Sequence, residues 1–251
     1  MLSTKSEEFI DNLRMYLMIS GKNEREIKEL IGELQDHLIE VEKSGRSIED
    51  IIDQSPEQYM SSLKKEMKTD YKSLIKFLPI FLLSVIAYFL MGPAIRGEFE
   101  LNLIQVGGLP IIALFGLAIY VYFLQQAGKK QYSKKKFFIG GMIASAIVTL
   151  TTILILVASK IIVDPFFIGN TIADIIVIVI CCCIFIMIAI WSKAWLPIWL
   201  PTILFIPDVF SRFTNIGIEA QLMLSISSYL LMFIVLLLNL WIAEKRKNAT
   251  S

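Results

Sequence analysis

The stretch IIVIVICCCIFIMIAIWS, residues 175–192, runs for 18 consecutive residues without a charged side chain. About 20 mostly apolar residues in a helix cross the roughly 30 Å hydrocarbon layer of a bilayer, so this stretch predicts a membrane-spanning helix. The segments 77–95, 101–128, 137–159 and 220–243 are likewise uncharged, over 19, 28, 23 and 24 residues. The expected fold class is therefore all-α, with several helices crossing a membrane.

The composition of the 251 residues agrees with a membrane protein, because 55% are hydrophobic, 19% are charged and the mean hydropathy is +0.65. A soluble domain has about 25% charged residues. The charge is uneven: residues 1–73 hold 11 Lys/Arg and 16 Asp/Glu, whereas residues 74–251 hold 13 and 7. We expect two domains, an acidic soluble one over 1–73 and a membrane domain over 74–251. This balance excludes a secreted disulfide scaffold and a single-domain soluble enzyme.

The number of spans depends on residues 194–207, which are uncharged but contain three prolines. Proline removes backbone donors, so the segment reads as a kinked short span or a re-entrant loop. Cytoplasmic loops collect Lys and Arg. Six spans place 14 of these residues inside against Arg96, Lys160 and Arg212 outside, and five spans give 12 against 5. We therefore predict a six-helix bundle with both termini in the cytoplasm and spans at about 75–95, 102–125, 137–159, 172–192, 194–210 and 220–243.

Residues 1–73 are predicted to form consecutive short helices. Helix starts are indicated by Thr4 with Glu7 three residues on, by Asn23, by Ser47 for a short turn over 48–52, and by SPEQ at 55–58. Gly21 and Gly45 suit the left-handed positions that follow helix ends.

Several of these residues carry a family resemblance. The run ELQDHL at 33–38, followed by Gly45 and by SPEQY at 55–59, resembles the HAAS domain, and SEEFIDNLR at 6–14 is similar to the first helix of that family. HAAS domains are small helical modules found beside PadR-like winged-helix transcription regulators in bacteria, often fused to a membrane region. The resemblance covers about residues 1–70. It implies a signalling or protein-interaction role and brings no catalytic residues with it.

The expected partner-binding surface lies on the segments that carry the resemblance, at Leu34, Asp36, His37, Leu38, Pro56 and Tyr59. His37 is the one histidine. It has no nucleophile and orienting group beside it in the sequence, so we expect a packing role at the edge of its helix. The net charge of −5 on the domain opposes DNA binding, so we expect no direct contact with nucleic acid.

Asp174 is the one carboxylate inside an otherwise apolar stretch, which makes it a candidate intramembrane polar site. We expect it near the interface, where it reaches water; the alternative is a buried, paired charge. Asp208 and Glu219 are expected in outer loops. The neighbouring Cys181, Cys182 and Cys183 are expected to fill a helix contact, because zinc sites need spaced ligands on converging elements. No cofactor and no metal is expected.

Lys129, Lys130, Lys134, Lys135 and Lys136 form a compact basic loop. Each cation near an anionic leaflet contributes about 1 kcal/mol, so the loop is expected to hold the cytoplasmic membrane surface. A second possibility is that it attracts the acidic domain near residues 40–53, in a contact that salt weakens.

The function that these patterns favour is a membrane signalling or adaptor protein that is not an enzyme. Its cytoplasmic domain would bind a protein partner, expected to be a PadR-like regulator. The sequence does not decide whether the protein also forms a homo-oligomer. The alternative is a small permease or the membrane subunit of an exporter, because transporters build their sites at broken helices. An intramembrane enzyme is the third and weakest reading.

Overall fold

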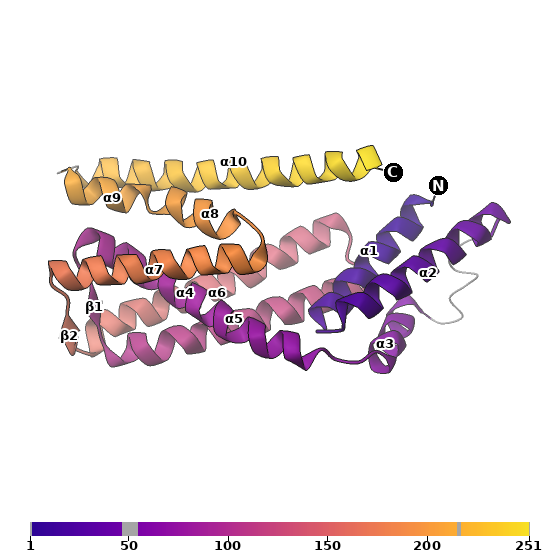
Figure 1. The fold of residues 1–251 in the computed structure, drawn as a ribbon, viewed down its shortest axis with the longest axis horizontal. Coiled ribbons are helices and arrows are strands. Elements are labelled where there is room, and N and C mark those ends of the chain that lie inside the picture. The colour runs from indigo at the N-terminus through magenta and orange to yellow at the C-terminus, as the bar shows by residue number, and fades with distance from the viewer. Residues whose placement is uncertain (1, 47–54, 215–216, 251) are drawn as a thin grey trace. The chain divides into compact units, whose positions relative to one another are not determined.

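The computed structural model describes residues 2–46, 55–214 and 217–250, and within these ranges it is all-α apart from two short strands (Figure 1). The elements in order are α1 (Thr4–Ile19), α2 (Glu24–Lys43), α3 (Pro56–Glu66), α4 (Tyr71–Arg96), β1 (Glu100–Leu101), α5 (Leu103–Lys129), α6 (Lys134–Ile162), β2 (Phe167–Ile168), α7 (Thr171–Ser192), α8 (Leu196–Leu204), α9 (Ile206–Phe213) and α10 (Ile218–Thr250). The predicted fold class is confirmed in this respect.

The chain divides into two compact units. The first unit holds residues 1–79 and 111–157, and the second holds residues 80–110 and 158–251. The helices α4, α5 and α6 each contribute residues to both units.

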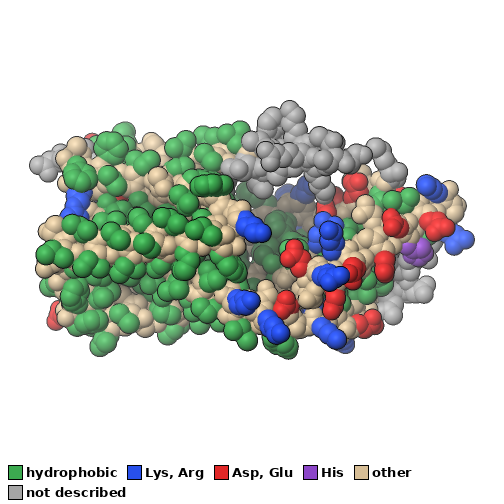
Figure 2. Space-filling model, viewed as in Figure 1, with side chains coloured by type: hydrophobic (Ala, Val, Ile, Leu, Met, Phe, Trp, Pro, Cys, Tyr) green, Lys and Arg blue, Asp and Glu red, His purple; other side chains and the backbone are tan. Residues whose placement is uncertain are grey.

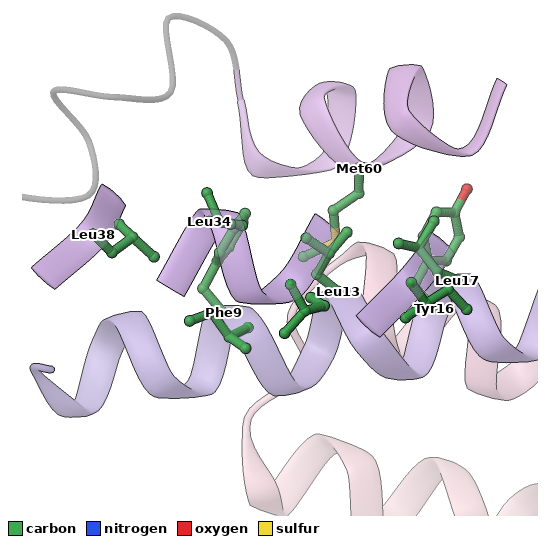
Figure 3. Packing of buried hydrophobic residues seen from close by; sticks show 10 residues of the cluster. Phe9, Leu13, Tyr16, Leu17, Leu34, Leu38 and Met60 are labelled. Atoms are coloured by element: carbon green, nitrogen blue, oxygen red, sulfur yellow. The ribbon is translucent and has the colours of Figure 1, made fainter. Parts of the chain in front are cut away.

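In the first unit, α1, α2 and α3 form an N-terminal helical domain around one core (Figure 3). Its apolar residues recur at helical spacing, so each helix presents one apolar face to the others. The buried members are Phe9, Ile10, Leu13, Tyr16 and Leu17 from α1, Ile27, Ile31, Leu34 and Leu38 from α2, and Met60 from α3. The core is thus made by the apolar faces of three short helices packed against each other.

The helix ends follow the predicted caps with one shift. Asn23 accepts hydrogen bonds from two backbone N–H groups of α2, and Ser55 forms a reciprocal capping box with Gln58. The cap of α1 is Ser3, which accepts from the backbone of Ser6, so the prediction of Thr4 was one residue late. Gly21 and Gly45 have φ of +69° and +80°, as predicted. The turn predicted at 48–52 lies outside the described residues.

Four helices, α4, α5, α6 and α7, are long and apolar enough to cross a membrane. The pair α8 and α9 adds a fifth span if it is counted as one segment, although it bends by 41° at Phe205. Proline at 201 and 207 explains the break, because each proline lacks a backbone donor. In α10 the described apolar part is residues 219–235, which is shorter than these four helices. The structure therefore supports four or five spans, and the predicted sixth is not shown.

Hydrophobic side chains cover much of the visible surface of the membrane helices, whereas acidic and basic side chains gather over the helical domain (Figure 2). Residues such as Ile161 and Ile190 are more than 70% exposed. Soluble proteins rarely expose so many large apolar side chains on one continuous surface. The surface of these helices therefore fits a lipid environment.

In the second unit, β1 and β2 pair antiparallel, with Glu100 opposite Ile168 and Leu101 opposite Phe167. The buried Asn102 supports this region, because its Nδ2 donates to the carbonyl of Ser159 at 3.0 Å. These contacts hold the start of α5 beside the end of α6.

Candidate functional site

The residues predicted to bind a partner separate into buried and exposed positions. Leu34 and Leu38 are 8% and 0% exposed and belong to the core of the helical domain. Asp36, His37 and Pro56 are exposed. Tyr59 is half-buried, and its ring lies 6.1 Å from that of Phe9. The two leucines therefore support the fold of the domain from its core. Asp36, His37 and Pro56 are the residues that can contact another protein. We expected His37 to pack at the edge of its helix, but its side chain is exposed.

The helical domain contacts the end of α5 within the first unit. Gly128 is buried there, and a Cβ added to it would lie 3.0 Å from the carbonyl oxygen of Asn12 and 3.1 Å from Cβ of Tyr16. Gln125 donates from Nε2 to the carbonyl of Ile19 at 3.4 Å. Because Gly128 has no side chain, α1 approaches α5 at backbone distance.

One lysine of the basic loop also reaches the acidic domain. Lys129 Nζ lies 3.0 Å from Oε1 of Glu57, at the start of α3. The predicted attraction between loop and domain is thus realised in one ion pair, at Glu57. The predicted region 40–53 is only partly described, because residues 47–54 fall outside the described ranges.

A second connection ties the turn between α1 and α2 to the segment that precedes α4. Lys22 donates from Nζ to the carbonyl of Met67 at 2.8 Å and to the hydroxyl of Thr69 at 3.1 Å. The backbone N–H of Asp70 donates to the carbonyl of Gly21 at 2.8 Å. The turn between α1 and α2 therefore holds the segment that leads directly into α4.

Hydrogen bonds to one carboxylate connect the start of α1 with the end of α2. The carboxylate of Glu42 accepts hydrogen bonds from the backbone and hydroxyl of Ser3 and from the hydroxyl of Ser6. These donors favour the ionised form and lower the pKa of Glu42. Burial raises the pKa of Tyr59, with a further contribution from the negative charge of Glu66.

In the second unit, a cluster of paired charges joins α4, α7 and α9. Arg96 Nη1 lies 2.7 Å from Oδ1 of Asp208, and Arg212 Nη1 lies 3.7 Å from Oδ2 of Asp174. Arg212 also donates to the last carbonyls of α4, at Ala94 and Ile95, at 2.9 and 2.8 Å. A cation at a helix C-terminus and an anion at a helix N-terminus both complement the helix dipole.

This cluster corrects two expectations. Asp174 is only 3% exposed and is paired with Arg212, so the expected access of its carboxylate to water was wrong, and the alternative of a buried, paired charge fits the structure. Its Oδ1 is buried and has no hydrogen-bond partner among the described residues. Asp208 lies in the first turn of α9 and not in a loop. The sequence spacing could not show either pair, because the partners are 38 and 112 positions apart.

An apolar pocket of about 370 Å³ lies beside the same elements. Its lining is almost entirely hydrocarbon and comes from α4, α7, α8 and α9. Cys182 is among the lining residues, whereas Cys181 is 2% exposed and packs with Ala87 and Phe185 as the predicted filling of a helix contact. This pocket was not predicted from the sequence, because it depends on the bend between α8 and α9.

Within the described ranges, no three His, Cys, Asp or Glu residues are grouped closely enough to hold a metal ion. The charged side chains that do gather in the second unit are engaged with each other and with backbone carbonyls.

Residues 86–204, a little under half of the chain, match the family model described as the HAAS transmembrane region. The recognition of a HAAS-type membrane protein is thereby confirmed over residues 86–204; the match covers the membrane helices and not residues 1–70, on which the resemblance was based. No curated protein and no solved structure matches the chain.

Proposed function

We propose that this multi-pass membrane protein of the HAAS family is a signalling adaptor, whose helical domain binds a cytoplasmic protein and relays the state of the membrane helices to it. The expected partner is a PadR-like transcription regulator. The observation that carries the proposal is the double attachment of the helical domain, through Lys22 to the segment that leads directly into α4 and through the close approach at Gly128 to α5. A domain held at two helices responds when those helices move relative to each other.

The orientation proposed with this function places both termini in the cytoplasm and counts six spans. The basic loop between α5 and α6 supports it, because lysines collect on the cytoplasmic side. Arg96 and Arg212, which this orientation places outside, are paired with carboxylates. Pairing lowers the net charge that must cross the bilayer during insertion.

For a signal to pass, the partner must prefer one arrangement of the membrane helices over another. The bent pair α8 and α9 is the proposed movable element. Its contacts with α7 and α10, and the ion pairs from α9, are interactions that a rearrangement would exchange.

Transport remains the alternative, because α8 and α9 form the kind of broken helix around which transporter sites are built. The charges beside that break favour the adaptor. Asp208 and Arg212 each have a partner inside the protein, and a polar substrate would have to displace those partners. We also propose that the protein has no catalytic activity.

The test is a binding measurement between the full-length protein in lipid nanodiscs and the PadR-like regulator encoded nearest to its gene. We expect specific retention of the regulator. The double variant Asp36→Lys, His37→Glu changes two exposed residues of α2 and should weaken binding by about fivefold or more, the effect expected when residues at the centre of an interface are replaced.

The matched control is Arg14→Glu, which reverses a charge on the exposed surface of α1 and should leave binding unchanged. Absence of retention of the regulator would refute the adaptor proposal, and retention of a nucleotide-binding ATPase offered in its place would favour the exporter alternative.

A further inference from the structure

A second and larger cleft lies within the first unit, between α1 and the start of α6, with a volume of about 860 Å³. It is lined by polar residues from α1 and the α5–α6 turn and by apolar residues farther along α6. The sequence places its floor at the membrane boundary, because the charged run 134–136 is followed directly by the uncharged segment 137–159. The cleft therefore spans the change from water to hydrocarbon.

The polar part of the cleft carries charges of both signs. Glu8 and Asp11 contribute carboxylates from α1, and Lys134 contributes an ammonium group from the first residue of α6. A molecule that complements this lining has a cationic group for the carboxylates and an anionic group for the lysine. A purely anionic molecule would meet the two carboxylates.

The α5–α6 turn adds a hydrogen-bond donor. Gln131 lines the cleft and has a left-handed backbone, with φ of 46°. Its Nε2 is buried and has no acceptor among the residues that the structure describes. A buried donor without an acceptor costs about 1–3 kcal/mol. An oxygen atom supplied by a ligand in the cleft would pair this amide.

The apolar part of the cleft follows α6 into the membrane. Phe137, Phe138 and Met142 give it hydrocarbon and aromatic surface, and Gly141 also lines it. Tyr132 also lines the cleft, and tyrosine is enriched at membrane–water interfaces. The lower cleft thus suits an acyl chain, and the upper cleft suits a polar headgroup.

We propose that this cleft binds a membrane phospholipid whose headgroup carries both a phosphate and a primary ammonium group. The ammonium group lies against Glu8 and Asp11, the phosphate against Lys134, and one acyl chain along α6. Phosphatidylethanolamine has this chemistry. The trimethylammonium group of phosphatidylcholine has no N–H to donate, and phosphatidylglycerol has no cation.

The experiment is native mass spectrometry of the full-length protein, released from membranes that contain equal amounts of phosphatidylethanolamine, phosphatidylcholine and phosphatidylglycerol. We expect phosphatidylethanolamine to be retained about two- to fivefold more than either other lipid, the discrimination that one solvent-exposed ion pair provides. The variant Glu8→Lys should abolish that preference. Glu7→Lys, which alters a neighbouring exposed residue outside the cleft, should preserve it.

A second pair of variants tests the apolar part. Ser145→Leu fills the lower cleft and should reduce retention of all three lipids, whereas Ala146→Leu adds the same side chain to an exposed position outside the cleft and should not. Equal retention of the three lipids would mean annular lipid only, and a preference for phosphatidylglycerol would assign binding to the basic loop. Either result overturns the proposal. The measurement involves no regulator, so its result is independent of the test of the adaptor function.

Discussion

Arg96 at the end of α4 and Asp208 in the first turn of α9 form a 2.7 Å ion pair, although 112 positions separate them in the chain. Their side chains are 30% and 18% exposed. The pair fixes the second half of the broken helix to α4. Gly92 makes this possible, because a Cβ at that position would lie 3.3 Å from Oδ2 of Asp208 and 3.4 Å from Nη1 of Arg96.

The first prediction concerns this pair. Asp208→Asn should lower the free energy of unfolding by about 1–3 kcal/mol, between the small value of an exposed pair and the larger cost of breaking a buried one. Thermal unfolding in detergent measures the change, and a double-mutant cycle with Arg96→Gln isolates the pairwise term. Glu98→Gln is the comparison, because Glu98 also pairs with Arg96, at 3.0 Å, but its side chain is 65% exposed and losing that pair should cost less. A coupling energy of zero would contradict the role given to the pair.

The second prediction concerns the contact between α1 and α5. Gly128→Leu should separate α1 from α5, because even a Cβ there would lie 3.0 Å from a backbone oxygen. In a background without the three native cysteines, the variant should speed maleimide labelling of Asn12→Cys. Gly107→Leu lies in the same helix, where an added Cβ has no atom within 4 Å, and should leave the labelling rate unchanged. Equal rates in both variants would show that Gly128 does not control docking.

The local structure of the helical domain was predictable because its signals lie within a few residues of each other. The capping box at Ser55 and the N-cap at Asn23 depend on donors two or three positions away. The apolar residues of α1 and α2 also recur at helical spacing, which is a local signal for the faces that meet in the core. The cap of α1 was misplaced by one residue because Ser3 and Thr4 are both good N-caps.

The candidate sites were less predictable because they depend on the bend of α8–α9 and on contacts between distant segments. Asp174 was recognised as unusual, but its partner Arg212 lies in α9 beyond the break. The three prolines of residues 194–207 indicated a break without its direction, so the apolar pocket could not be predicted. The cleft of the first unit combines α1 with α6, which local periodicity does not relate.

The third prediction tests the core of the helical domain. Leu13 is fully buried, so Leu13→Ala should cost about 2–5 kcal/mol through lost burial and the cavity left behind. A domain of this size has little stability to lose. We expect loss of protease resistance in residues 2–70 while the membrane helices persist. Met18→Ala, at a residue that is 53% exposed, should behave as wild type; equal effects would place the core elsewhere.

The fourth prediction is a pH dependence centred on Glu42. Hydrogen bonds from Ser3 and Ser6 lower the pKa of its carboxyl group in the folded state. A carboxyl with a depressed folded pKa stabilises the fold above its unfolded pKa, and this contribution is lost as the pH falls through the folded pKa. At pH 7, Glu42→Gln should therefore lower the unfolding midpoint of the helical domain. As the solution is acidified below the ordinary carboxyl range, the difference between wild type and variant should shrink towards zero. Glu40→Gln, at an exposed position two residues earlier, serves as the control at each pH. A difference that stays constant from pH 7 to acid would mean that Glu42 acts through its shape and not through its charge.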